Sequence, residues 1–250
     1  MHLNQATVLL VDDEPMLLEL MSKWFEREKC RVLTAENGMQ ALQKIMSDRV
    51  HVIVSDVRMP VMDGYALVNG IKGNHIYRPS VIFVSGFHDI PVRASYDMGV
   101  EASFPKPVRR EELISTVRRI LMDRSELWSS PLVGGRAPSL EAALGSVSQA
   151  VEQGLIAFGR GGFCFQTEVL HQEGLVRLAI DFERDQQSIR GEGHVRWCCT
   201  HEGRMGVEIT ALEPSCREWV HGLTQANPTL SYIPANTASA ASSTTQGVTV

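Results

Sequence analysis

The sequence contains no long apolar stretch. Runs such as Val8 to Val11 are far shorter than the roughly 20 residues that a membrane-spanning helix requires. The first residues also lack a basic segment followed by an apolar stretch and a cleavage site, which together mark a secretory signal. We therefore expect a cytoplasmic protein that does not act at a membrane.

Cysteine and lysine are scarce as well. Five cysteines without an export signal indicate free thiols rather than a disulfide framework. All five lysines lie before residue 125. Residues 1–124 hold 16 Lys+Arg and 16 Asp+Glu, whereas residues 125–250 hold 8 and 13, which together give the 24 and 29 of the whole chain. This acidic second half argues against DNA binding, because DNA-binding proteins concentrate positive charge on one face.

The first 123 of the 250 residues alternate between two patterns. Short runs rich in β-branched residues predict strands at residues 7–11, 31–35, 51–55, 80–85 and 101–104. Between them, apolar residues recur at helical spacing, as in Leu17, Leu20, Met21 and Trp24. Strands that alternate with helices predict a parallel sheet with helices on both faces.

The second half has a different organisation. A Ser-, Gly- and Pro-rich stretch after Asp123 predicts a linker, and a helix is expected over Leu140 to Val151, capped by Ser139 and ended by Gly154. Packing on its own domain is the ordinary role of such a helix, and dimerisation is the alternative. We predict a first domain over 1–123, a linker with an amphipathic helix over 124–154, a small β-barrel with a closing helix over 155–223, and a disordered tail over 224–250.

Acidic residues stand where two of the predicted strands end. Asp12 and Asp13 follow the first strand and Asp56 follows the third. The carboxyl ends of parallel strands border the ligand crevice, so these carboxylates should converge there. Like charges ~4 Å apart repel by about 4 kcal/mol at the effective dielectric of a protein surface. The cluster therefore predicts a bound cation, and an oxygen-only ligand set suits Mg2+.

The fourth and fifth strands bring a hydroxyl and a positive charge to the same edge, from Ser85 and Lys106. Together with a carboxylate nucleophile and a metal, these groups suit phosphoryl transfer.

Four short motifs at these strand ends carry a resemblance to a known family. They are VDDEP at 11–15, SDVRMPVMDG at 55–64, VSG at 84–86 and FPKP at 104–107. Residues 7–122 thereby resemble the CheY-like receiver domain of two-component response regulators. The resemblance implies a flavodoxin-like, doubly wound α/β fold with five parallel strands in the order 2-1-3-4-5. It also implies a protein that is not an enzyme, apart from its own phosphorylation and dephosphorylation.

The resemblance also implies roles for individual residues. Asp56 is expected to be the residue that a histidine kinase phosphorylates. Asp12, Asp13 and Asp56 are expected to hold Mg2+, together with the backbone carbonyl of Arg58.

Three further residues complete the expected switch. Lys106 should pair with the phosphoryl group and Ser85 should hydrogen-bond to it, while Phe104 should change rotamer with Ser85. Phosphorylation should then rearrange the face formed by Ile90 to Arg124.

The glycine-rich stretch GLIAFGRGGFCF at 154–165 poses a separate question. Neither GxxxxGK[ST] nor GxGxxG fits, because both need a following helix and FCFQTEV predicts a strand. With GEGHVRW at 191–197 and RMGVEITALEP at 204–214, residues 155–222 resemble a PilZ domain, a small β-barrel that commonly binds cyclic di-GMP.

The ligand motif of that family is degenerate in this chain. The family uses an RxxxR pair followed by [DN]xSxxG, but counting back from Gly162 the acidic or amide position is Ala157 and the serine position is Gly159. Residues 137–159 contain no Arg or Lys. Without these charge-assisted contacts, binding of cyclic di-GMP in the usual mode is not expected.

His194, Cys198, Cys199 and His201 also suggest a zinc site, but neighbouring residues of a strand point to opposite faces and no CxxC spacing exists, so packing thiols are favoured.

The sequence thus predicts a response regulator whose degenerate PilZ output domain acts through contacts with a downstream protein target. A receptor that also binds cyclic di-GMP is the alternative, a catalytic second domain is a weaker one, and homodimer formation is left open.

Overall fold

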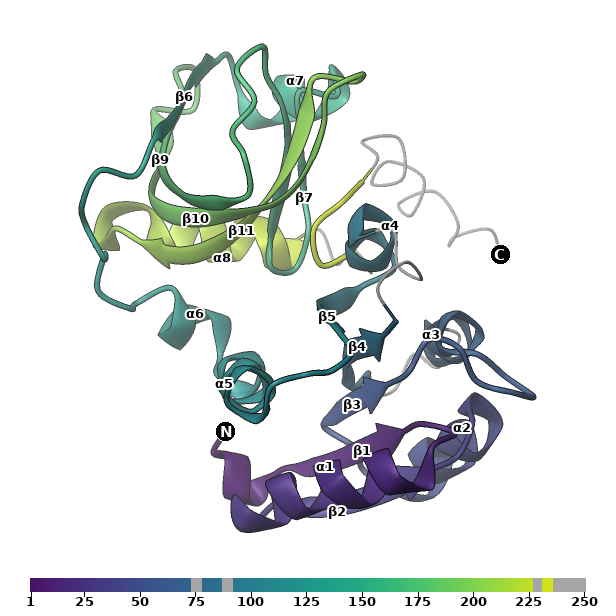
Figure 1. Ribbon diagram of the computed structural model, residues 1–250. Helices are drawn as coiled ribbons and strands as arrows, with labels where there is room; N and C mark the ends of the chain where they lie inside the picture. The colour runs from purple at the N-terminus through teal and green to yellow at the C-terminus, as the bar shows by residue number, and fades with distance from the viewer. Residues whose placement is uncertain (73–77, 87–91, 227–230, 236–250) are drawn as a thin grey trace, which may run out of the picture. The chain divides into compact units, whose positions relative to one another are not determined.

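The computed structural model describes residues 1–72, 78–86, 92–226 and 231–235 (Figure 1). The chain divides into two compact units, Met1–Asp123 and Arg124–Val250. None of the helices in these described stretches is long and apolar enough to cross a membrane.

The first unit is built on a sheet of five parallel strands in the order β2-β1-β3-β4-β5. The strands are β1 (Thr7–Val11), β2 (Arg31–Ala35), β3 (Val52–Ser55), β4 (Ser80–Ser85) and β5 (Val100–Pro105). The predicted fold is therefore confirmed. The bounds of β1, β2 and β4 are those predicted, and β3 and β5 differ by a single residue at their ends.

Helices cover both faces of this sheet because successive strand residues point to opposite sides. On β1, Val8 and Leu10 belong to one core cluster, with apolar residues of α1 and α5, whereas Leu9 and Val11 belong to another, with α2 and α3. The helices and the short 3-10 turn η1 are η1 (Leu3–Gln5), α1 (Pro15–Arg27), α2 (Gly38–Ser47), α3 (Gly64–Lys72), α4 (Val92–Asp97) and α5 (Arg110–Leu121).

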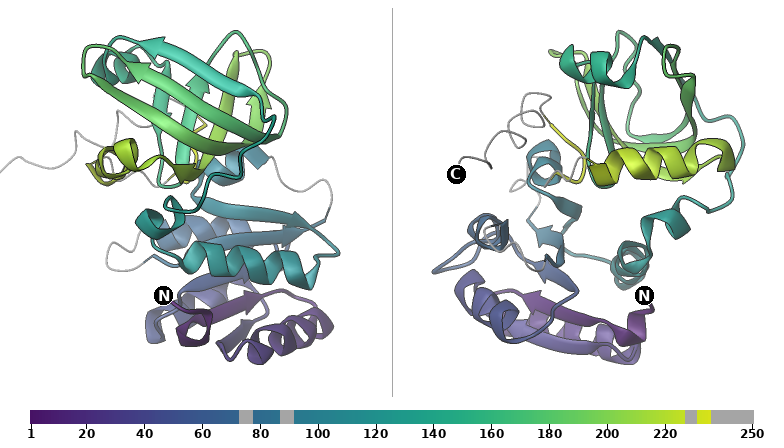
Figure 2. Two further views of the ribbon diagram at one scale, coloured as in Figure 1. Left: turned by 90° about the vertical axis from the view of Figure 1, so that its left-hand side faces the viewer. Right: turned by 180° about the vertical axis from the view of Figure 1, so that it is seen from behind.

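The second unit contains a six-stranded sheet that curls into a half-barrel (Figure 2). Its order is β6-β9-β10-β11-β8-β7; β6 pairs with β9 in parallel and the other pairs are antiparallel. The strands are β6 (Ser139–Leu144), β7 (Ile156–Phe158), β8 (Gly162–Gln166), β9 (Gly174–Phe182), β10 (Gln187–Cys199) and β11 (Arg204–Leu212). The helices are α6 (Arg124–Leu127), α7 (Val147–Glu152) and α8 (Pro214–Ala226).

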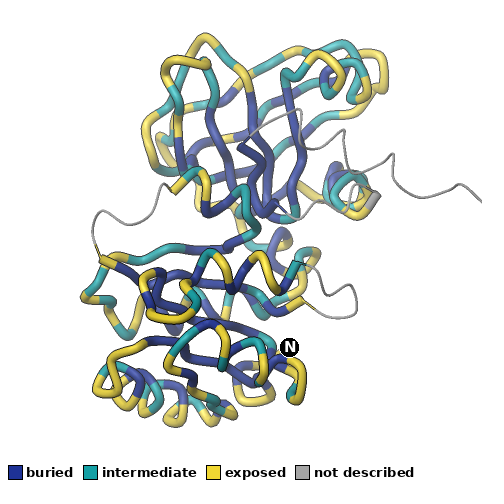
Figure 3. The backbone as a smooth tube through the Cα atoms, turned by 90° about the vertical axis from the view of Figure 1, so that its right-hand side faces the viewer, coloured by how far each residue is buried: buried dark blue, intermediate teal, exposed yellow. Residues whose placement is uncertain are grey.

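The half-barrel has its own apolar core, which follows the strands (Figure 3). Phe163, Phe182 and Val195 are fully buried, and Trp197 lies opposite Gly206 in the β10–β11 register. A Cβ atom at residue 206 would collide with the Trp197 indole ring. Glycine at this position is therefore what allows a tryptophan to fill the core.

The predicted helix over Leu140 to Val151 is wrong in its first half. Residues 139–144 form strand β6 beside β9, with Leu140 opposite Leu178, and only Val147–Glu152 is helical. The alanines of this segment allow either structure, so strand pairing overrides the local helical pattern. Ser146 rather than Ser139 caps the helix by accepting the Gln149 N–H, and the helix ends before Gly154 as predicted. Much of the predicted linker therefore belongs to the half-barrel.

The predicted disordered tail is also wrong where the structure describes it. Helix α8 continues to Ala226, beyond the predicted end at Leu223. Residues 231–235 are buried on the half-barrel, with Tyr232 and Ile233 fully buried. An aromatic and a branched apolar side chain together supply enough apolar surface to order this short segment. The rest of the predicted tail lies outside the described residues.

Candidate functional site

Three carboxylates meet where β1 and β3 end. Asp12, Asp13 and Asp56 each offer an oxygen within 4.8 Å of the others. The Asp56 N–H donates to the Val11 carbonyl at 2.8 Å, which holds the ends of the two strands together. Asp12 and Asp56 are buried and Asp13 is exposed. The predicted convergence therefore follows directly from the parallel pairing of β1 and β3.

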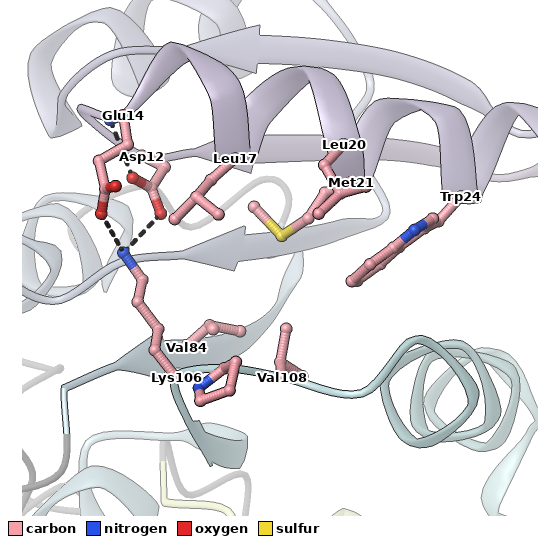
Figure 4. A pocket seen from close by; sticks show the side chains of 10 residues that line it. Asp12, Glu14, Leu17, Leu20, Met21, Trp24, Val84, Lys106 and Val108 are labelled. Carbon is pink, nitrogen blue, oxygen red and sulfur yellow. Dashed lines mark hydrogen bonds and ion pairs between the residues drawn. The ribbon is translucent and has the colours of Figure 1, made fainter.

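Lys106 lies among these carboxylates just after β5. Its Nζ is 2.6 Å from Asp56 Oδ2. The same Nζ is 2.9 Å from Asp12 Oδ2 and 3.4 Å from Glu14 Oε1 (Figure 4). Lys106 is therefore placed to contact any group bound between the two aspartates. The sequence reasoning did not single out Glu14; its position next to the aspartate pair was the available signal.

The electrostatics of the site are dominated by burial and by charge pairing. Burial raises the pKa of Asp12, against the opposing effects of Lys106 and the Glu14 N–H. Burial alone would lower the pKa of Lys106, but hydrogen bonds and charges from Asp56 and Asp12 outweigh it and raise that pKa. The lysine therefore stays charged. The site contains four carboxyl groups, from the three clustered aspartates and Glu14, whereas Lys106 supplies one positive charge. The site therefore keeps an excess of negative charge.

The donor set fits a magnesium ion. Asp56 Oδ1 accepts the N–H groups of Val57 and Arg58, at 2.5 and 3.2 Å, which leaves Oδ2 facing Lys106. Asp12 Oδ2 is buried and accepts no aligned hydrogen bond from the described residues, although it forms the ion pair with Lys106. Buried, under-used carboxylate oxygens with excess charge are the ligands that Mg2+ prefers. The three carboxylates are therefore placed to hold a Mg2+ ion.

The other predicted site residues lie on neighbouring strands. Ser85 is buried at the end of β4, and its carbonyl accepts the Lys106 N–H at 2.8 Å. Phe104, on β5, is partly buried against the core cluster shared by α1 and α5. Arg58 lies two residues after Asp56, and metal binding by its carbonyl stays a prediction. Residues 90 and 91 of the predicted switch face lie outside the described residues.

An apolar pocket of about 370 Å3 adjoins the carboxylates (Figure 4). It lies between α1 and the residues that follow β5. Its apolar lining consists of Leu17, Leu20, Met21, Trp24, Val84, Pro107 and Val108. The helical spacing of the α1 residues was visible in the sequence, but it did not indicate that part of this apolar face stays uncovered.

In the second unit, the three positions compared above with the PilZ ligand motif carry no polar side chain. Ala157 is a buried residue of β7, and Gly159 and Gly162 flank the turn into β8. Sequence reasoning missed two buried acids of this unit. Glu208 pairs with Arg196, and Glu192 accepts backbone N–H groups. Neither acid is near a second acid in sequence, so no pattern marked them.

Comparison with known proteins agrees with the geometry of the first unit. A family model for the response regulator receiver domain matches residues 8–118. The chain is 30% identical over 125 residues to the DNA-binding transcriptional regulator NtrC of Escherichia coli K12, and 34% identical over 117 residues to the transcriptional regulatory protein CpxR homolog of Haemophilus influenzae. These matches cover 50% and 46% of this chain, but only 26% and 50% of the relatives.

A solved structure, the chemotaxis response regulator CheY4 of Vibrio cholerae, is 29% identical, with a TM-score of 0.44; the match covers 47% of this chain and 99% of that one.

Residues 8–118 are a response regulator receiver domain, which is the class that the sheet order and the acidic pocket define. The half-barrel lies outside the family match.

Proposed function

We propose that the chain is a two-component response regulator in which Asp56 accepts a phosphoryl group from a histidine kinase. The observation that carries this proposal is the position of Lys106 Nζ, within 3 Å of both Asp56 Oδ2 and Asp12 Oδ2. Asp56 is held by two backbone N–H groups on its other oxygen, so Oδ2 is oriented for attack.

In the proposed reaction, Asp56 Oδ2 attacks the phosphorus of a phosphohistidine. The new O–P bond forms as the P–N bond breaks, and the imidazole leaves. Lys106 pairs with the phosphoryl oxygens, and the Ser85 hydroxyl hydrogen-bonds to one of them. Asp12, Asp13, Asp56 and the Arg58 carbonyl would hold Mg2+, and the bound ion would offset the negative charge that both reactants carry. The chain does no other chemistry in this proposal.

The phosphorylated state acts as a conformational switch. The Lys106 N–H donates to the Ser85 carbonyl, which joins the two residues. A phosphoryl group that attracts one of these side chains therefore also shifts the other residue. Phe104 follows on β5 and packs on the core beside α5. Phosphorylation then shifts the conformational equilibrium of the face formed by α4, β5 and α5 toward its rearranged conformation.

The half-barrel is proposed to be a PilZ-like output domain that acts through protein contacts. Its glycine loop lacks the polar side chains of a nucleotide site, and the N–H groups of Arg160 and Gly161 donate to carbonyls of the chain's own residues 231 and 232. A cyclic di-GMP phosphate would have to displace residues 231 and 232 to reach these donors, and the loop positions Ala157, Gly159 and Gly162 carry no polar side chain that would assist it. The acidic balance of residues 125–250 argues against DNA as the target, although NtrC is named as DNA-binding.

Labelling with radioactive acetyl phosphate in the presence of Mg2+ tests the proposal. We expect wild type and Asp63→Asn to take up label, because Asp63 is an exposed residue whose carboxylate accepts the Ala66 N–H before α3, a role that asparagine can fill. Asp56→Asn should take up none. Equal labelling of Asp56→Asn and wild type would refute the assignment.

A further inference from the structure

The glycine loop of the half-barrel is in direct contact with the C-terminal segment, residues 231–235. The loop joins β7 to β8. The Arg160 N–H donates to the Ser231 carbonyl at 3.0 Å, and the Gly161 N–H donates to the Tyr232 carbonyl at 2.9 Å. The segment is thus held by its backbone, and it bends at Tyr232 and Ile233 rather than forming a strand.

Two glycines of the loop make room for this segment. A Cβ atom at Gly159 would lie 2.6 Å from the Tyr232 carbonyl oxygen and 2.8 Å from Pro234 Cδ, and one at Gly161 would collide with the Tyr232 ring. Neither glycine has a left-handed φ, so its backbone conformation does not require glycine. The nearest atoms to both positions belong to residues 231–234. The missing side chains therefore serve contact with the segment.

Tyr232 is the anchor of the segment. Its side chain is fully buried, and its hydroxyl donates to Glu208 Oε1 at 2.7 Å. Glu208 is itself fully buried and accepts from Arg196 Nε at 2.7 Å. The guanidinium carbons of Arg124 and Arg160 lie 5.0 and 5.8 Å from the centre of the tyrosine ring. Tyr232 thus combines a charge-assisted hydrogen bond with cation–π contacts.

We propose that this region is a peptide-binding site, the tyrosine socket, formed by Arg124, Gly159, Arg160, Gly161 and Glu208. Residues 231–235 occupy it as an internal ligand, and an uncharged, tyrosine-containing segment of a partner protein that takes the same bent conformation displaces them. The biological use of the socket rests on the proposed function of the half-barrel as a unit of protein contact.

The chemistry of the socket sets its specificity. The buried Glu208 carboxylate accepts from a tyrosine hydroxyl, but it repels a phosphotyrosine or an acidic side chain. A phenylalanine fills the space without satisfying Glu208. The two loop N–H groups bind two consecutive carbonyls of the segment, and Gly159 leaves space for the proline that follows the anchor by two residues.

A tethered ligand competes strongly with a free one. A ligand that belongs to the same chain as its site acts at an effective concentration on the order of millimolar, so a free peptide binds weakly while the segment stays docked. The full-length variant Tyr232→Ala removes the anchor and leaves the socket open. Its binding to a fluorescent peptide that copies residues 229–236, TLSYIPAN, is measured by anisotropy without phosphorylation.

We expect the peptide to bind Tyr232→Ala at least about tenfold more tightly than wild type. A peptide with phenylalanine in place of tyrosine should bind about tenfold more weakly, because the hydrogen bond to a charged acceptor is lost. A phosphotyrosine peptide should not bind. Adding Gly161→Ala to the Tyr232→Ala chain should abolish binding, whereas adding Gly222→Ala should not, since a Cβ at Gly222 meets no atom within 4 Å.

A further peptide carries alanine in place of its tyrosine. The proposal would be overturned if this peptide bound the Tyr232→Ala chain as tightly as the tyrosine peptide does, or if the folded Tyr232→Ala chain bound neither peptide. If that variant does not fold, a full-length chain with a protease site in place of residues 227–230 is folded first and then cut. After cleavage the segment is held only by its contacts with the socket, so the labelled peptide should displace it. If the cleaved segment stays bound at a saturating concentration of peptide, the proposal is contradicted. Because none of these measurements involves Asp56, failure of the socket is distinguishable from failure of phosphorylation.

Discussion

The two units of the chain treat their acidic residues in opposite ways. In the receiver unit, Asp12, Asp13 and Asp56 are gathered at one sheet edge around a single lysine. In the half-barrel, the buried acids stand apart and each has its own donors. Glu208 has Arg196 and Tyr232, and Glu192 accepts the N–H groups of Val133 and Gly134, at 2.8 and 2.9 Å.

The difference is between a cluster whose negative charge exceeds that of its partners and single acids whose charge is paired by groups of the chain itself. A buried charge that is fully paired stabilises the structure only as long as its partners remain. A cluster with excess negative charge adds little to the stability of the fold, and a bound cation reduces the repulsion between its carboxylates. Removing a carboxylate should therefore cost stability in the half-barrel and binding in the receiver.

The largest expected effect is that of Glu208→Ala. It leaves the Tyr232 hydroxyl and Arg196 without their common acceptor, so we expect the half-barrel to lose about 3 kcal/mol or more of its free energy of unfolding. Urea unfolding followed by tryptophan fluorescence measures this. Asp56→Asn is the matched change in the receiver, and we expect it to alter the free energy of unfolding by less than about 1 kcal/mol. Equal losses in the two units would contradict the distinction.

Magnesium should stabilise only the receiver unit. A ligand at 100 times its dissociation constant adds about 2.7 kcal/mol to the free energy of unfolding of the unit that binds it. Trp24 is the single tryptophan of residues 1–123, so its fluorescence reports on that unit. We expect EDTA to reverse the gain and Asp13→Asn to abolish it, since Asp13 is exposed and its loss does not disturb the core. If Mg2+ raised the free energy of unfolding of the half-barrel by a similar amount, the proposed difference between the two units would be wrong.

Glu192 is expected to have an intermediate effect. The substitution Glu192→Gln keeps the size of the side chain but removes the charge, so the two N–H groups of residues 133 and 134 lose a strong acceptor. We expect a loss of about 1.5 kcal/mol and faster proteolysis near residue 134. Glu141→Gln is the control, because Glu141 is exposed on β6. Identical behaviour of the two variants would show that Glu192 does not fix this segment.

The smallest effect concerns pH. The Thr7 N–H donates to His51 Nδ1 at 2.9 Å, which requires the neutral ring, and burial, followed by Arg49, lowers the pKa of His51. The unfolded chain therefore binds the proton more readily, and the receiver loses stability as pH falls below the ordinary histidine pKa of about 6.5. We expect a loss of about 1 kcal/mol at most between pH 7 and 5. Urea unfolding of His51→Gln should show a smaller pH dependence, and an unchanged one would exclude this histidine as its cause.

The sequence predicted the receiver unit well for physical reasons. Strands such as Thr7–Val11 are buried on both faces, so they form continuous apolar runs that are easy to recognise. Once the strands are parallel, Asp12 and Asp56 must meet, because both follow the end of a neighbouring strand. The site therefore needed only strand positions and no tertiary detail.

The features that the sequence did not predict depend on contacts between distant residues. Strand β6 forms because β9 offers it an edge, which the helical spacing of residues 140–151 cannot reveal. Tyr232 is ordered by Glu208 and by the glycine loop, so its role is invisible within a Ser-, Thr- and Ala-rich tail. The pocket beside α1 likewise depends on what the fold leaves uncovered.

The central claim is that the excess negative charge of the receiver serves a magnesium ion and a phosphoryl group. Intact mass measured after incubation with acetyl phosphate tests it most directly, with wild type and Asp12→Asn compared in Mg2+ and in EDTA. We predict one added phosphoryl group for wild type in Mg2+ and at least a 100-fold slower addition in the other three cases. Equal phosphorylation of Asp12→Asn and wild type, or no dependence on Mg2+, would contradict the account.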